Sequence, residues 1–552
     1  MRRATAAALV SVFVLAVLPR SVVAQGEDAA QLSPGTLRIT LAPDWSRWDH
    51  RFGEGTPGYA RGALEPAGID FSSDSLGTGQ LPFLQGVQTR VRNLTGLSAF
   101  RLNLGRAQLT LNTSVRVVPL GLELGITRRL AIGVTVPIVR SRVEAFLLGP
   151  DTGAAAAATR GNVGWNPAFL TPGALDTFRL EVDSMLNALA AQAASGPPAL
   201  QAQAQAMLAG MQSQLCDLWA LAGSLTPADA ASPCAAAGDA QVAPLLPDTG
   251  SEAGRAITAW LGGAQANYEQ LRAQYAALGV TLPGFALGFA LPTTPLDSAG
   301  LRRFLTDRNG PLAADSLTSV VRTRLGDVEV GASYQLADRA RLRTLVTLIA
   351  RLPTGYVDSK DNLIDVGTGD HQLDVEVGVR NDIVLGSAFW IHAGGRYGMQ
   401  FSDQLDRRVS PANLPFAPFA ASARVKRDLG DYVAIDIVPN WRLDDAFSLG
   451  LAWRYFRQGA TRFGYTDPAD EARIGLPASV LDRETAITRM RIGAGMTFST
   501  LSRYAAGRAR LPYTVTASYQ NTFWGAGGRV SAASVFNLTI RGYVRVWQQR
   551  ER

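Results

Sequence analysis

The sequence is poor in histidine, cysteine, lysine and charge. Its 552 residues include three histidines and two cysteines, and Lys360 and Lys426 are its lysines. Charged residues make up 18%, below the roughly 25% typical of soluble domains. After the first twenty or so residues, no apolar run reaches the about 18 residues that a membrane-spanning helix needs. With 47% hydrophobic residues, the composition excludes a mostly disordered chain, and the lack of long runs excludes a bundle of membrane helices.

The formal net charge is +7, which at first suggests a nucleic-acid partner. The basic residues are instead scattered along the chain, without the clustering and aromatic interleaving of a nucleic-acid surface. We therefore expect no nucleic-acid partner.

The N-terminus has the pattern of an export signal. Arg2 and Arg3 precede an apolar stretch over 6–18 that is too short to span a bilayer, and Ala24 ends a plausible cleavage site. The pattern predicts a signal peptide over 1–24 and a mature chain that begins at Gln25. An uncleaved anchor is the alternative.

Alternating apolar and polar residues predict β-strands in most of the exported chain. The segment from Leu325 to Leu336 is typical, because Val328, Val330 and Ala332 alternate with polar or small residues. Twelve segments follow this reading: 37–41, 122–126, 130–136, 325–336, 342–350, 373–379, 389–397, 433–437, 447–455, 490–498, 513–519 and 536–546. The fuller ones have about 10 residues, the length of a tilted strand that crosses a membrane.

The connections between these segments alternate in length. Short turns at 127–129, 337–341, 384–387 and 442–446 separate long connections at 43–105, 146–324, 354–371, 401–430 and 457–484. Aromatic residues gather near strand ends, as at a membrane interface: Trp45, Trp48, Tyr397, Trp441, Tyr455, Phe523, Trp524 and Trp547. Short turns on one side and long loops on the other are typical of outer-membrane barrels. We expect an all-β transmembrane barrel of about 12 antiparallel strands, with a soluble β-sandwich as the alternative.

The segment 146–324 differs from the rest, because it is rich in Ala, Gln and Leu with helical periodicity. Helices are expected over 175–194, 198–221 and 252–278. An even number of cysteines in an exported chain favours a disulfide between Cys216 and Cys234. The chain thus divides into 25–145 with the first strands and a long first loop, a helical insertion in an extracellular loop over 146–324, and the remaining strands over 325–552. The insertion is expected to cap the barrel or to enter it as a plug.

A short motif repeats within the strands. Asp327-Val328-Glu329-Val330-Gly331 recurs as Asp374-Val375-Glu376-Val377-Gly378, and Leu122-Glu123-Leu124-Gly125 is a partial copy. Together with Arg351-Leu352-Pro353-Thr354-Gly355 and Gly367-Thr368-Gly369-Asp370, these stretches resemble the outer-membrane barrels associated with meta-pathway phenol degradation, a transporter-like group distantly similar to the long-chain fatty acid channels. The resemblance covers the strands and not the insertion. It implies passage of small compounds, with hydrophobic compounds as one class, and identifies no site residue.

The face opposite the apolar one carries the charges that we expect in the lumen. They are Glu123, Asp327, Glu329, Asp374, Glu376, Arg380, His392, Arg396, Asp436, Arg454, Arg489, Arg491, Arg541 and Arg545. Acids predominate in the earlier strands and arginines in the later ones. This order predicts either a transverse field that orients polar solutes or a structural network that fills a narrow barrel.

Few residues suggest catalysis or metal binding. His392 could serve as the base of a barrel-embedded lipid hydrolase, yet no serine shares its strand face. Asp358, Asp361, Asn362 and Asp365 share one loop but lack the spacing of a calcium site. We expect no enzyme activity, no metal and no cofactor.

The sequence therefore favours an outer-membrane channel for passive passage of small compounds in a Gram-negative-type bacterium. Its expected surroundings are outer-membrane lipid and a solute that the sequence does not identify. The alternative is a surface-anchored barrel whose helical insertion binds a partner.

Overall fold

The computed structural model describes residues 31–547 except 57, 151–158, 167–173, 223–231, 235–244, 286–289, 309, 316 and 412–413. The expected signal peptide lies outside the described residues. Among those that are described, no helix is both long and apolar enough to cross a membrane.

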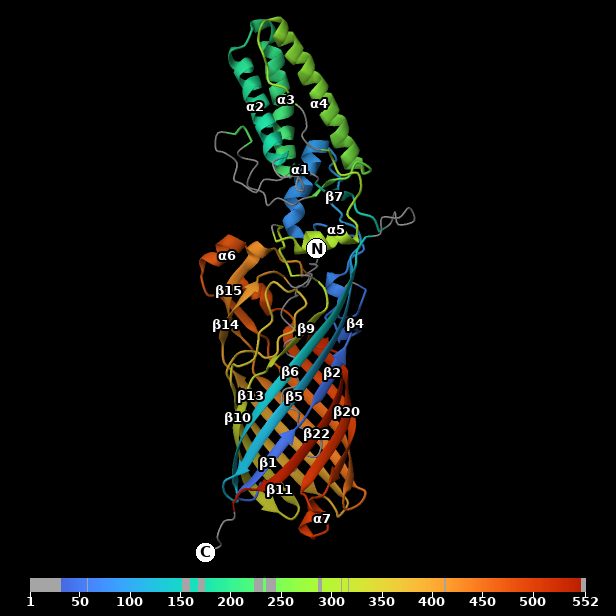
Figure 1. Cartoon of the computed structure of the whole chain (residues 1–552), viewed down its shortest axis with the longest axis vertical. Helices are drawn as coiled ribbons and strands as arrows, with labels where there is room; N and C mark the ends of the chain where they lie inside the picture. The colour runs from blue at the N-terminus through green and yellow to red at the C-terminus, as the bar shows by residue number, and fades with distance from the viewer. Residues whose placement is uncertain are drawn as a thin grey trace, which may run out of the picture.

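The wall is a closed antiparallel barrel with twelve strand positions around its circumference, and Figure 1 shows it from the side. Two of these positions are each shared by two strands, β1 with β2 and β9 with β10. In wall order the strands are β1 (Thr36–Leu41) with β2 (Asp44–Trp48), β5 (Gln108–Gly125), β6 (Leu130–Leu148), β9 (Val320–Leu325) with β10 (Glu329–Arg339), β11 (Leu342–Arg351), β12 (Asp374–Val384), β13 (Phe389–Gln400), β16 (Tyr432–Arg442), β17 (Phe447–Gln458), β19 (Thr485–Ser499), β20 (Tyr513–Gly528) and β22 (Ser534–Arg545). The ring closes because β1 and β2 pair with both β5 and β22. Closure satisfies the hydrogen bonds of the wall without free edges.

The remaining elements lie outside the wall. Small sheets comprise β3 (His50–Phe52), β4 (Leu64–Pro66) and β21 (Val530–Ser531); β7 (Val163–Trp165) and β8 (Leu245–Pro247); and β14 (Asp403–Arg408), β15 (Ser422–Asp428) and β18 (Arg462–Tyr465). The α-helices are α1 (Gln85–Thr95), α2 (Ala174–Ser195), α3 (Pro198–Ala222), α4 (Glu252–Ala277), α5 (Ser298–Thr306), α6 (Ala469–Ile474) and α7 (Leu501–Ala505). Short turns and α7 mark one end of the barrel, the turn end, and α1 to α5 mark the other, the helical end (Figure 1).

The structure confirms the expected 12-strand barrel and corrects several of its details. The strand β2 lies within the segment read as a long loop over 43–105, because Pro43 interrupts the first wall strand without ending it. The strands β5 and β6 reach 18 and 19 residues, well beyond the length needed to cross a membrane. Since β6 ends at Leu148 and β9 begins at Val320, both ends of the segment 146–324 belong to the wall.

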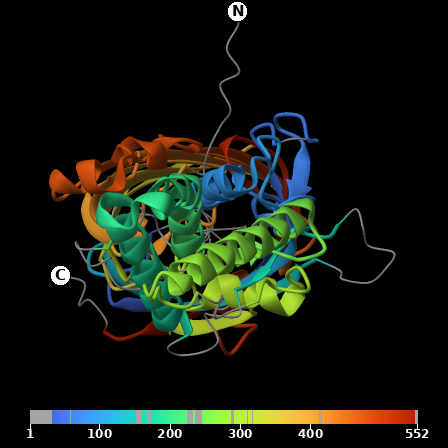
Figure 2. The same ribbon diagram turned by 90° about the horizontal axis from the view of Figure 1, so that it is seen from above.

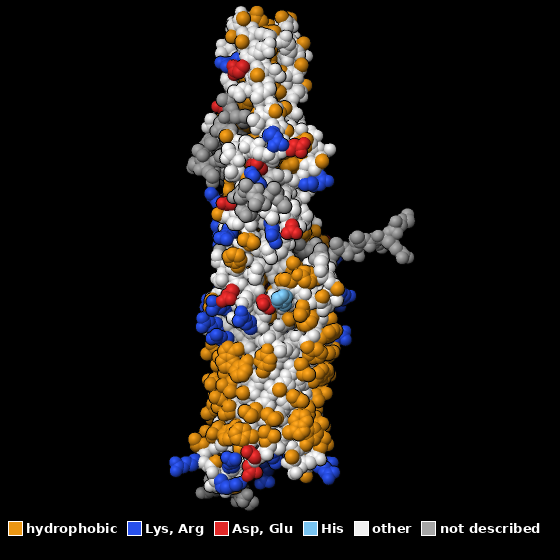
Figure 3. Space-filling view, turned by 90° about the vertical axis from the view of Figure 1, so that its right-hand side faces the viewer, with side chains coloured by type: hydrophobic (Ala, Val, Ile, Leu, Met, Phe, Trp, Pro, Cys, Tyr) orange, Lys and Arg blue, Asp and Glu red, His pale blue; other side chains and the backbone are white. Residues whose placement is uncertain are grey.

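Side chains alternate between the two faces of the wall, as in any pleated strand. The outward residues Val330, Val377, Leu451 and Ile492 are 39%, 41%, 51% and 57% exposed. On the face drawn in Figure 3, apolar side chains form a belt over the turn half of the barrel, with basic residues along both of its borders. A belt of this kind faces lipid in a transmembrane barrel. Trp48 is an exception to the expected interfacial aromatics, because it is buried in the apolar core beyond the belt.

The helices α1 to α5 lie beyond the helical end and cover the barrel mouth (Figures 1 and 2). One apolar core extends from wall residues such as Val117 and Val535 through α1 and α5 into α2, α3 and α4. The helices α2 to α4 stand farthest from the barrel, so they do not enter it as a plug (Figure 1). The expected disulfide between Cys216 and Cys234 is present at the base of α3, with a Cα–Cα distance of 5.1 Å.

Candidate functional site

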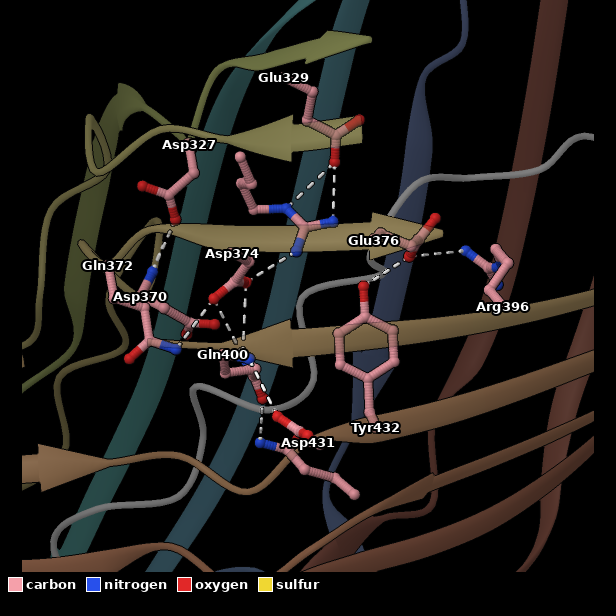
Figure 4. Close-up of polar contacts among 12 residues, drawn as sticks. Asp327, Glu329, Asp370, Gln372, Asp374, Glu376, Arg396, Gln400, Asp431 and Tyr432 are labelled. Carbon is pink, nitrogen blue, oxygen red and sulfur yellow. Dashed lines mark hydrogen bonds and ion pairs between the residues drawn. The ribbon is translucent and has the colours of Figure 1, made fainter. Parts of the chain in front are cut away.

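Arg351 is the centre of an ion-pair network on one side of the lumen. It is aligned with Glu329 on β10 and with Asp374 on β12 in the antiparallel register. Its Nε and Nη2 atoms donate to Glu329 Oε1 at 3.1 and 2.9 Å, and Nη1 donates to Asp374 Oδ2 at 2.8 Å (Figure 4). Because all three side chains are largely buried, removal of the arginine would leave two carboxylates without their shared cation.

The network continues across β12, β13, β16 and β17. Tyr432 Oη donates to Glu376 (Figure 4), and the tyrosine ring lies so close to Gly398 that a Cβ there would be 2.1 Å from a ring carbon. Asp436 accepts from Arg396 at 3.3 Å and pairs with Arg454 at 3.2 Å. We call the lumen charges of β10 to β13 and β16 the paired side.

Asp327 does not lie on a wall strand but between β9 and β10. Its buried carboxylate accepts from the backbone N–H groups of Gly355 and Asp370, both at 2.7 Å. A Cβ at Gly369 would lie 2.3 Å from Asp327 Oδ2, so this position needs glycine. The motif residues around 355 and 369 therefore fasten a loop to the barrel rim.

Three acidic residues of the 354–371 loop are paired with cations of the chain. Asp358 pairs with Arg407, Asp361 with Arg408 and Asp365 with Arg322, each at 2.7 Å. Burial raises the pKa of Asp358 above its ordinary value, although Arg407 opposes this shift. Across the residues that the structure describes, no group of three or more His, Cys, Asp or Glu side chains could hold a metal ion.

Arginines dominate the opposite side of the lumen, on β19 and β22. Arg489, Arg491 and Arg541 are all at least nine-tenths buried, and we call them the basic side. The Arg489 guanidinium lies 4.6 Å from the ring centroid of Phe456. Arg491 Nε donates to Thr522 Oγ1 at 3.2 Å.

Two cavities lie inside the barrel wall. The first, of about 50 Å³, is bordered by Arg396, Arg454, Arg489 and Arg491 together with Asp44, Asp436 and Tyr432. The second, of about 190 Å³, lies nearer the turn end and is bordered by residues that include Arg38, Glu123, Ser333, Thr347 and Arg380. The structure thus leaves space between charged side chains that point inward.

The other candidate residues lie nearer the turn end. Glu123 is paired with Arg38 and also accepts from the Ser333 hydroxyl at 3.1 Å. Buried His392 is hydrogen-bonded through Nδ1 to Asp382 Oδ1 at 2.8 Å. Arg545 is exposed at the last residue of β22.

The sequence reading did not identify Arg351, Asp44, Arg38 or Tyr432 as lumen residues. Arg351 has the same parity as Thr347 and Ile349, so extension of the 342–350 strand by one residue would have found it. Asp44 was missed because the sequence was read as a loop from residue 43 onward. No simple signal reveals Tyr432, since its role depends on the contact with Glu376 on a distant strand.

The fold and the lumen define a transmembrane β-barrel with a charged and partly filled interior. No family model matches the chain, and no curated protein matches it. Similar solved structures include an outer membrane channel from Pseudomonas putida F1, with 8% identity, coverage of 94% of this chain and 98% of that chain, and a TM-score of 0.40.

Two further similar structures are hydrocarbon transporters or channels. The Pseudomonas putida toluene transporter TodX has 9% identity, coverage of 93% and 90%, and a TM-score of 0.27. The monoaromatic hydrocarbon channel CymD has 8% identity, coverage of 94% and 90%, and the same TM-score. These TM-scores are too low to support a conclusion about this chain. The assignment of a barrel therefore rests on the closed pairing of its strands.

Proposed function

We propose that this protein is an outer-membrane channel for passive passage of small compounds, hydrophobic ones among them. The observation that carries the proposal is the apolar belt around a closed wall whose interior holds two cavities. Lipid-facing apolar residues place the wall in a membrane. The inward polar groups and the space between them suit a solute path rather than a solid core.

The helical end is proposed to face the outside of the cell. Outer-membrane barrels have short turns on the periplasmic side and longer loops outside, and the long connections of this chain lie at the helical end. The helices would then form an external cap, after export that depends on the cleaved signal peptide over 1–24.

A liposome-swelling assay with sugars, small aromatic compounds and fatty acids tests the channel. Vesicles that contain the protein should admit at least one solute class faster than protein-free vesicles of the same lipid. Solute influx equal to that of protein-free vesicles for every class would refute the channel.

The second candidate function is a membrane anchor that presents the helices to a partner. The distance of α2 to α4 from the barrel favours it. Trp165 on β7 and Leu245 on β8 are register partners, so a two-residue Asn-Gly turn can replace 166–244 and remove α2, α3 and the disulfide. Influx that persists after this deletion supports the channel. If neither the full-length protein nor the deletion variant admits any solute, the result supports the anchor.

A further inference from the structure

Two arginines face each other on the outer surface of the barrel wall. Arg116 on β5 and Arg140 on β6 are register partners, so their Cα atoms are about 4.5–5.5 Å apart. Both residues are exposed and point away from the lumen, because the residues on either side of each are buried. Within the described part of the chain, neither side chain has a hydrogen bond or an ion pair. Like charges directly opposite each other destabilise a sheet, so the fold alone does not account for this pair.

Two further arginines extend the positive charge around the pair. Arg142 lies two residues along β6, and Arg47 belongs to the adjacent strand β2, both on the outward face. Arg142 pairs with Glu144 at 2.7 Å, whereas Arg47 donates to the neutral amide oxygen of Asn112 at 3.1 Å. Toward the helical end, the outward face of these three strands thus carries four arginines and one glutamate. We call the four arginines the arginine patch.

The arginine patch borders an apolar surface. Toward the turn end, β5 and β6 expose apolar side chains, with exposed fractions of 48% for Leu120, 40% for Leu122, 48% for Ile132 and 53% for Ile138. Trp45 on β2, the register partner of Arg116, lies on the same face, with its ring centroid 5.4 Å from that of Phe536. Such a border places cations at the level of the lipid headgroups and apolar side chains against the acyl chains.

We propose that the arginine patch binds the phosphate groups of lipopolysaccharide, the phosphorylated glycolipid of the outer leaflet. Guanidinium groups donate paired hydrogen bonds to phosphate oxygens. Several arginines on adjacent strands suit a headgroup with two phosphates, and its acyl chains lie along the apolar residues of β5 and β6. The site goes beyond the proposed channel because it is on the outside of the wall. Its assignment to the outer leaflet rests on the proposed orientation, with the helical end outside the cell.

Native mass spectrometry of the full-length protein in detergent tests the site without any need for transport. The probes are lipid A with two phosphates, lipid A with one phosphate, and phosphatidylglycerol. Lipid A with two phosphates should bind at least about tenfold more tightly than either of the others, since one hydrogen bond to a charged group contributes that much or more.

Variants of the opposed pair assign the effect to this surface. Arg116→Gln/Arg140→Gln should weaken binding of lipid A with two phosphates at least about tenfold. Arg116→Lys/Arg140→Lys should weaken it less, because lysine keeps the charge but not the planar donors. The matched control Arg128→Gln/Arg129→Gln removes the same charge from an exposed turn at the turn end and should leave binding unchanged.

Thermal unfolding in detergent, followed by tryptophan fluorescence, separates binding from folding. Without lipid A, the glutamine double variant of the opposed pair should melt at the wild-type temperature or above it, because the repulsion between the arginines is gone. Lipid A with two phosphates should raise the melting temperature of the wild type more than that of the variant. A lipid-free variant that melts well below the wild type would show that the pair supports the wall itself and would count against the proposal.

Three binding results would also overturn the proposal. They are unchanged lipid A affinity in folded Arg116→Gln/Arg140→Gln, an equal loss of affinity in Arg128→Gln/Arg129→Gln, and binding of either other probe as tight as that of lipid A with two phosphates. Any of them, combined with solute influx in the swelling assay, would remove the lipid site and leave the channel intact. Lipid A binding that depends on the pair, without influx of any solute, would retain the site and remove the channel.

Discussion

The two sides of the lumen differ in how their charges are satisfied. On the paired side, Glu329 and Asp374 share Arg351, while Asp436 lies between two arginines. On the basic side, Arg491 keeps an Nη2 donor without a hydrogen bond in the described structure. Ion pairs between acids and arginines join adjacent strands on the paired side, whereas Arg491 on the basic side is hydrogen-bonded to Thr522.

The comparison predicts the largest loss of stability on the paired side. Arg351→Ala should lower the free energy of unfolding by about 3–5 kcal/mol, because Glu329 and Asp374 would remain buried without their cation. Urea unfolding in lipid vesicles, followed by tryptophan fluorescence, measures the change. Arg343→Ala changes a more exposed arginine of the same strand and should cost less than about 1 kcal/mol. Equal losses for the two variants would contradict the distinction.

On β19, we expect arginine to be tolerated on the lumen face but not on the lipid face. Ile492 follows Arg491 and is 57% exposed in the apolar belt. Ile492→Arg should cost about 2–4 kcal/mol in the same unfolding experiment, the cost of a cation that faces the middle of a bilayer. Leu443→Arg, in an exposed turn, is the matched control and should cost less than about 1 kcal/mol. A similar cost at both positions would show that the belt does not face lipid.

Removal of the basic-side charge should have a much smaller effect on folding. Arg491→Gln removes a buried charge that is incompletely paired, so it should change the free energy of unfolding by less than about 1 kcal/mol or increase it. The same urea titration compares it directly with Arg351→Ala. A loss as large as that of Arg351→Ala would mean that the two sides are equally structural.

A change in the helical insertion should leave both sides of the lumen unaffected. The pair Cys216→Ser/Cys234→Ser removes a crosslink with a sequence separation of 18 residues, which stabilises by roughly 3 kcal/mol in the chain-entropy model. Faster hydrogen exchange should be confined to α3 and neighbouring helices, with wall amides unchanged. Faster exchange in the wall would show that the insertion supports the barrel.

The sequence predicted the number of wall strands and the three long helices because both depend on local periodicity. The predicted helix over 198–221, for example, agrees with α3 to within one residue. The charge pairs depend instead on register between strands, as for Glu329 and Arg351, which are 22 residues apart. In the sequence, acids and arginines thus looked largely segregated, apart from Arg380 and Arg396 among the acids, whereas the structure also pairs Arg351 and Arg454 with acids.

The most direct test of the account is the relative permeation of two aromatic ions of similar size. Stopped-flow light scattering would follow the entry of benzenesulfonate and phenyltrimethylammonium, with inert counterions, into vesicles that contain the wild-type protein or Arg491→Gln. The account predicts faster entry of the anion through the wild-type protein, with a smaller preference in the variant. Equal or faster entry of the cation, or no entry above that of protein-free vesicles, would contradict it.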